Sequence, residues 1–176
     1  MPGVPTQTAV CAAIAASMWS GAATAAADEE TANPATHLEA FNDTCRRGFP
    51  DLGVIANNAA AQGWQESKIR PISESANALP GARAFHKDGL MLFLTHPPGG
   101  QFRTVCQIAG AAKTRLTGAD IAASVSRSLN AGEPVFEKTR KSDMAVWTVA
   151  PSITVQAGIL SYQKTRTISI SARQGS

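Results

Sequence analysis

The amino-acid sequence predicts an α+β fold, in which a helical hairpin precedes an antiparallel sheet of about five or six strands and one further helix packs on a face of that sheet. Two capped helical patterns lie between residues 36 and 63. Strand patterns separated by short turns fill most of the chain from residue 82 onward, and strands joined by short turns run antiparallel. A third capped helical pattern, after Thr117, interrupts the strands.

The first 27 residues have the outline of a signal peptide. They hold no charged residue, are rich in alanine and end in Ala-Ala-Ala before an acidic run that begins at Asp28. No Lys or Arg precedes the apolar stretch, so the alternative interpretation is an alanine-rich tail. We expect cleavage after Ala27, a flexible segment at 28–35, a single domain at 36–176 and a periplasmic or secreted location.

The composition is typical of a globular protein, and its charge is mild. Of the 176 residues, 44% are hydrophobic and 16% are charged, and the formal net charge is +3. A nucleic-acid-binding domain of this size normally carries a denser basic stripe. The chain also contains no apolar run long enough to span a bilayer. We therefore expect no nucleic-acid partner and no transmembrane segment in the mature chain.

The first predicted helix runs from Thr36 to Arg47. Thr36–Glu39 matches the T-x-x-E capping box, in which the hydroxyl and the carboxylate bind backbone N–H groups of the first turn. Arg46 and Arg47 supply cations for the last turn, and Gly48 supplies a terminator. Cys45 falls on the same helix face as two large apolar residues, Leu38 and Phe41.

The second predicted helix begins after Asp51, which is a favourable N-cap, and ends at Gly63. Trp64 is expected to fold back over its last turn. The segment Gln65–Gly81 contains two prolines and several small polar residues, and it is expected to be a long surface connection.

Strand patterns begin at residue 82. Asp88-Gly89 separates two apolar segments and predicts a hairpin turn. Residues 102–108 alternate, so Cys106 lies on a face with other inward side chains. The cap at Thr117 starts a helix that ends near Asn130. The remaining strands are expected at 135–138, 144–149, 153–162 (with a bulge at Ala157-Gly158) and 166–173.

Cys45 is followed directly by two arginines, and nearby cations favour a reactive thiolate. However, the last turn of a helix raises the pKa of a thiol, because the dipole there is negative. Cleavage of the leader would remove Cys11 and leave Cys45 and Cys106, both on inward faces. We therefore expect a structural disulfide between them, which stabilises the fold by about 4 kcal/mol in the chain-entropy model.

The motifs of common catalytic and metal sites are missing from the sequence. It has no C-x-x-C, H-E-x-x-H, G-x-S-x-G, G-x-G-x-x-G or P-loop pattern. The three histidines, His37, His86 and His96, lie apart and are expected to be satisfied at the surface. We expect no catalytic, cofactor-binding or metal-binding residue.

Basic residues recur near the C-terminus. Lys164, Arg166 and Arg173 would form a cationic edge for an anionic partner if the last strands were adjacent. The alternative is that these cations only protect an edge strand from aggregation.

The chain resembles small, uncharacterised exported (periplasmic) proteins of proteobacteria. The resemblance is carried by the Phe-x-x-x-Cys helix, by the Asp-capped second helix and by the Gly63-Trp64 pair that ends this second helix. The resemblance covers the leader and residues 38–64, and it implies a leader, a helical opening and a β-rich remainder. It implies no activity and no site residue.

The functional expectation is a non-enzymatic periplasmic binding or interaction module, whose partner is a protein or an anionic envelope component. The alternative is a small cell-envelope hydrolase that uses the loop Gln65–Gly81 and the turn Thr95–Gln101. A cleft with a shifted histidine or carboxylate would favour the hydrolase.

Overall fold

A computed structural model describes residues 33–67, 81–97, 102–112, 115–162 and 165–175. The expected signal peptide and Lys164 lie outside these residues, as does most of the connection between residues 65 and 81.

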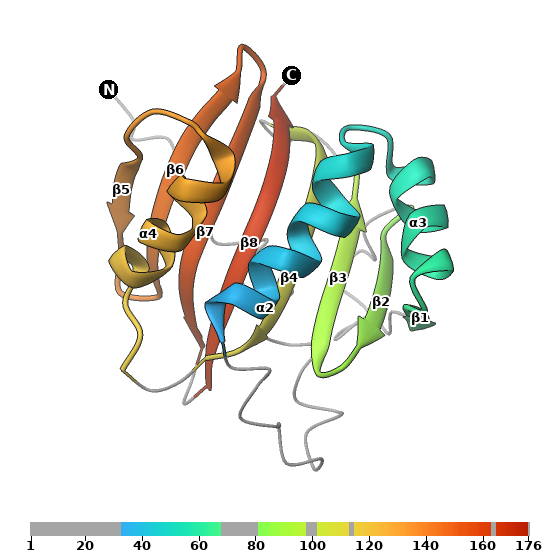
Figure 1. The fold of residues 1–176 in the computed structure, drawn as a ribbon, viewed down its shortest axis with the longest axis horizontal. Coiled ribbons are helices and arrows are strands. Elements are labelled where there is room, and N and C mark those ends of the chain that lie inside the picture. Colours follow the sequence, from blue (N-terminus) through green and yellow to red (C-terminus); the bar gives the residue numbers. More distant parts are fainter. Residues whose placement is uncertain (1–32, 68–80, 98–101, 113–114, 163–164, 176) are drawn as a thin grey trace, which may run out of the picture.

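The described chain forms one antiparallel sheet of eight strands (Figure 1). Their order across the sheet is β1-β2-β3-β4-β8-β7-β6-β5. The strands are β1 (Gln65–Ser67), β2 (Arg83–Lys87), β3 (Leu90–Thr95), β4 (Phe102–Ala111), β5 (Val135–Lys138), β6 (Ser142–Ala150), β7 (Ile153–Tyr162) and β8 (Thr165–Gly175).

The predicted fold class is therefore wrong, because the described part of the chain is mostly sheet and has eight strands rather than five or six. Strand β1 lies at the start of the segment expected to be a surface connection. It has only three residues, all polar, and it pairs with β2 through its backbone. Such a strand has no side-chain alternation that a sequence pattern can reveal.

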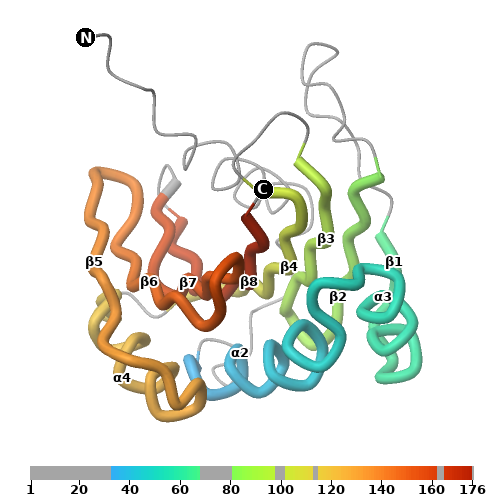
Figure 2. The backbone as a smooth tube through the Cα atoms, turned by 90° about the horizontal axis from the view of Figure 1, so that it is seen from above, coloured from blue at the N-terminus to red at the C-terminus, as the bar shows by residue number. Residues whose placement is uncertain are grey.

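The helices are α2 (Pro34–Phe41), the π-helix η2 (Asn42–Arg46), α3 (Leu52–Ala61) and α4 (Gly118–Leu129). In Figure 2 they all lie on one side of the sheet. Helix α4 separates the chain into two groups of four strands, and β8 closes the sheet by pairing with β4.

The first helix begins before the predicted start. Asn33, not Thr36, is its N-cap, and the Asn33 side chain accepts a hydrogen bond from the Ala35 N–H at 3.0 Å. Pro34 fixes a helical φ at the first position and has no N–H to satisfy, so it favours this earlier start. The helix then widens into η2, which carries Cys45.

The two other predicted N-caps are confirmed, whereas Gly48 does not have the positive φ of a left-handed helix terminator. Asp51 accepts hydrogen bonds from two N–H groups of the first turn of α3. Thr117 and Asp120 form a reciprocal capping box on α4. The backbone N–H of Trp64 donates to the Ala59 carbonyl across Gly63, and the Trp64 side chain is buried. Asp88 and Gly89 both have positive φ, as a tight hairpin turn requires.

The prediction of a bulge at Ala157-Gly158 is wrong, because β7 pairs regularly with both β6 and β8 at these residues. The irregularity lies between Thr148 and Ala150 of β6. Gly158 has a different role, since a Cβ at this position would collide with the Asp143 carbonyl of β6.

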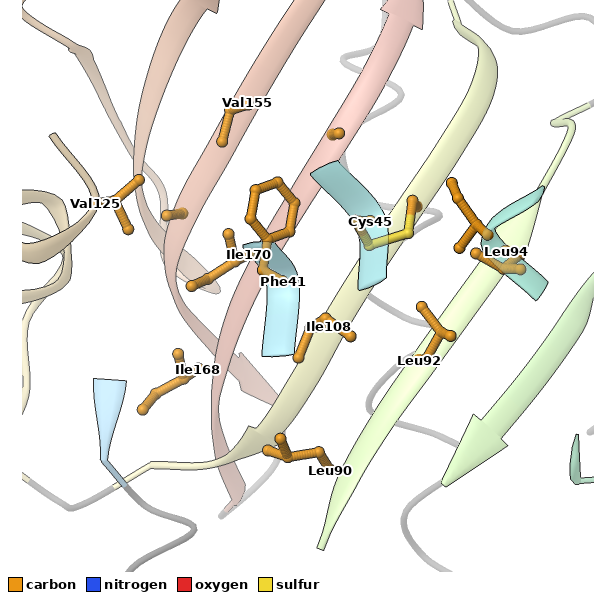
Figure 3. Close-up of a cluster of buried hydrophobic side chains, with 14 of the residues drawn as sticks. Phe41, Cys45, Leu90, Leu92, Leu94, Ile108, Val125, Val155, Ile168 and Ile170 are labelled. Atoms are coloured by element: carbon orange, nitrogen blue, oxygen red, sulfur yellow. A yellow bond between two sulfur atoms is a disulfide. The ribbon is translucent and has the colours of Figure 1, made fainter. Parts of the chain in front are cut away.

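The predicted disulfide between Cys45 and Cys106 is confirmed, with 5.8 Å between the two Cα atoms. It joins η2 to β4 inside the main hydrophobic core (Figure 3). The core lies between the helices and one face of the sheet, and it includes Phe41, Leu92, Ile108, Ile168 and Ile170.

Candidate binding face

The two faces of the sheet differ in chemistry. Alternate residues of each strand, such as Ile108 of β4 and Ile170 of β8, point into the core beneath the helices. The residues between them point to the opposite side. No helix of the described chain lies on that side, which we call the helix-free face (Figure 2).

Polar side chains gather at the centre of the helix-free face. Gln107 of β4, Ser171 of β8 and Gln156 of β7 are direct neighbours in one row across three strands. The polar cluster consists of Thr95, Gln107, Thr154, Gln156, Ser169, Ser171 and Arg173. Since β4 and β7 come from different halves of the chain, the cluster exists only because β8 lies between them.

The side chains of the polar cluster are buried, with the exception of the half-buried Thr154. Gln107 donates its amide N–H to the Ser169 hydroxyl at 2.8 Å. Three other buried atoms have no hydrogen-bond partner in the described chain, namely Ser171 Oγ, Gln156 Oε1 and Thr95 Oγ1. An unsatisfied buried polar group costs about 1–3 kcal/mol, so three on one face require an explanation.

Arg173 adds a positive charge to the cluster. It lies in the next row of β8 from Ser171, between Val105 and Thr154, and only 7% of its surface is exposed. Its guanidinium lies over the Phe102 ring, 5.2 Å from the centroid. The four central strands, β3, β4, β7 and β8, contain no Asp or Glu. The centre of the face thus combines a cation with hydroxyl and amide groups.

The structure does not bring Arg166 and Arg173 together. They lie near opposite ends of β8, about 23 Å apart along an extended strand. By alternation along β8, Arg166 lies on the same face as the core residues Ile168 and Ile170. It donates a hydrogen bond at 2.6 Å to the carbonyl of Leu116, which precedes α4 in the chain. Strand β8 is also an interior strand of the sheet, because it pairs with both β4 and β7.

His37 is fully buried, which corrects the expectation of a surface histidine. Its Nδ1 lies 3.0 Å from the Asn33 carbonyl, and its Nε2 lies against the backbone of Gly110 in β4. Burial lowers the pKa of His37, so the neutral ring is favoured. The sequence feature that could have indicated this burial is Gly110, a glycine within strand β4, because any larger residue there would collide with the His37 ring.

A second pair of polar residues lies on β1 and β2, at the edge of the sheet opposite β5. The Ser67 hydroxyl of β1 is 2.8 Å from Nδ1 of His86 on β2, and both residues are near the solvent. Beside them, Arg83 forms an ion pair with Glu66 at 2.7 Å, and this lowers the pKa of the carboxyl. Among the described residues no carboxylate binds His86, so the pair lacks the third member of a catalytic triad.

Among the described residues, no group of three His, Cys, Asp or Glu side chains is arranged to hold a metal ion. None of the described helices is long and apolar enough to cross a membrane. Comparison of the chain with protein-family models, curated proteins and solved structures finds no match. A functional proposal therefore depends on the chemistry of the sites themselves.

Proposed function

We propose that the protein is an exported, non-enzymatic binding module and that its ligand lies against the polar cluster of the helix-free face. The observation that carries the proposal is a set of three buried atoms at the centre of the sheet, Ser171 Oγ, Gln156 Oε1 and Thr95 Oγ1, that have no hydrogen-bond partner among the described residues. A ligand that supplies the missing hydrogen bonds would offset their desolvation cost.

The chemistry of the cluster indicates the kind of ligand. Arg173 favours an anionic oxygen, and the central strands themselves contain no Asp or Glu. Gln156 Oε1 can only accept a hydrogen bond, so the ligand must also carry a donor. The Ser171 and Thr95 hydroxyls can donate or accept. An acidic sugar, which carries a carboxylate beside several hydroxyls, meets these requirements.

Calorimetric titration tests the proposal with glucuronate and galacturonate as probes and with glucose as the neutral comparison. We expect an acidic sugar to bind and glucose not to bind. Ser171→Ala should weaken binding about tenfold, which is the usual effect of one lost hydrogen bond. Ser124→Ala on α4, on the other side of the sheet, is the matched control and should leave affinity unchanged. Absence of binding by both acidic sugars would refute the proposed ligand class.

Export is supported by the disulfide, because such bonds persist in oxidising compartments. We propose a periplasmic or secreted location, with a mature chain that begins at Asp28. Fractionation of producing cells and mass measurement of the intact protein test this. A cytoplasmic protein that retains Met1–Ala27 would contradict it.

The alternative function, a small envelope hydrolase, is favoured by one observation, the hydrogen bond between Ser67 and His86. A serine nucleophile needs a base at this distance. Labelling with a fluorophosphonate probe separates the two functions. Covalent labelling that disappears in Ser67→Ala would establish the hydrolase and overturn the non-enzymatic proposal.

A further inference from the structure

Strand β5 forms one edge of the sheet and pairs only with β6. All four of its residues are exposed, including 68% of Val135 and 56% of Phe136. The opposite edge, β1, is polar, with the sequence Gln-Glu-Ser. The apolar character of β5 is therefore not a general property of the edges of this sheet.

The pairing with β6 determines which backbone groups of β5 face outward. The Thr139 N–H donates to the Ser142 carbonyl at 2.8 Å, so these residues form a hydrogen-bonded pair next to the turn. Hydrogen-bonded and non-hydrogen-bonded pairs alternate along an antiparallel ladder. Val135 and Glu137 consequently bind β6, whereas the N–H and C=O groups of Phe136 and Lys138 point away from the sheet.

We propose that β5 pairs with β5 of a second copy of this chain, antiparallel and centred on Phe136. The two Phe136 residues exchange both of their backbone hydrogen bonds. The Lys138 N–H of each subunit donates to the carbonyl of the partner's Pro134, and this pair makes one bond rather than two because proline has no N–H to donate to the Lys138 carbonyl. The two eight-stranded sheets become one continuous sheet.

Side chains favour this register over its neighbour. It places the two exposed Phe136 rings opposite each other, and aromatic cross-strand pairs are stabilising. It also places Val135 beside the partner's Glu137. A pairing centred on Glu137 makes as many backbone hydrogen bonds, but it brings two like charges face to face. The strand is therefore complementary to a copy of itself in one register. This inference does not depend on the ligand proposed for the helix-free face.

Sedimentation equilibrium of the full chain tests the association, and we expect a concentration-dependent dimer. Phe136→Lys should raise the dissociation constant at least about 30-fold, because it removes the central aromatic contact and introduces two facing charges. Val54→Lys is the matched control, since Val54 is 44% exposed on α3, and it should leave dimerisation unchanged. Phe136 is itself exposed, so its replacement should not unfold the subunit.

Cysteine cross-linking tests the register in a chain that carries Cys11→Ser. Phe136→Cys should form a disulfide-linked dimer on mild oxidation, because directly opposite Cα atoms of a hydrogen-bonded pair lie about 5.5 Å apart. Glu137→Cys should cross-link poorly, since its own copy lies diagonally at about 8 Å, beyond the usual disulfide range. A monomer at all concentrations, or preferential linkage through position 137, would overturn the proposal.

Discussion

At the scale of the residue, the molecule contains two buried serines on the same face of β8 with different surroundings. Ser169 accepts a hydrogen bond from Gln107, whereas Ser171 Oγ has no partner in the described chain. A residue selected only for stability would not retain a buried hydroxyl of the second kind, because removing it costs nothing. Ser171 is the residue where a binding role and a purely structural role predict opposite results.

The two serines therefore form a matched pair of variants. Ser169→Ala should lower the free energy of unfolding by about 1–2 kcal/mol, because it leaves the Gln107 amide without its acceptor. Ser171→Ala should leave that free energy unchanged or raise it by about 1 kcal/mol. Urea denaturation measures both. Equal losses in the two variants would show that Ser171 serves the fold alone.

His37 predicts a pH dependence of stability. The folded protein lowers the pKa of this ring, so the unfolded chain binds more protons. The stability that the neutral ring contributes is complete above the unfolded value near 6.5, and it is lost as the pH falls through 6.5 toward the lower folded pKa. His37→Gln should lose less stability than the unchanged protein between pH 7.5 and 5, as measured by urea denaturation. Parallel pH profiles would contradict this.

At the scale of the element, local signals in the sequence were sufficient for most helices and turns. Asp51, Thr117 and Asp88-Gly89 act within a few residues of themselves, and the structure places each of them as predicted. The sequence does not predict strand β1, because its pairing with β2 depends on residues that are distant in sequence. The burial of the polar face of β8 was also not predictable, since it depends on β4 and β7 lying on either side.

The disulfide is an element-scale feature, because it fixes η2 on β4 across a sequence separation of 61 residues. The double variant Cys45→Ala/Cys106→Ala should lower the free energy of unfolding by about 4 kcal/mol in the chain-entropy model. Urea denaturation of the two proteins measures this difference. A loss below about 1 kcal/mol would mean that core packing alone holds η2 in place.

At the scale of the whole molecule, the last strand determines the architecture. Strand β8 lies between β4 and β7, so it joins the two groups of four strands and completes both faces of the sheet. One face carries the helices, the disulfide and the apolar core. The other face carries the polar cluster on the central strands, while β5 forms one edge of the sheet. The proposed ligand site and the proposed dimer edge thus occupy separate parts of the molecule.

The most direct test of the ligand site is a titration of the isotope-labelled protein with galacturonate, followed by amide chemical shifts. We predict shifts concentrated at Gln107, Gln156, Ser171 and Arg173, and a much weaker response in Ser171→Ala. Shifts confined to the exposed basic turn at Arg140-Lys141, or no shifts at any residue, would contradict it.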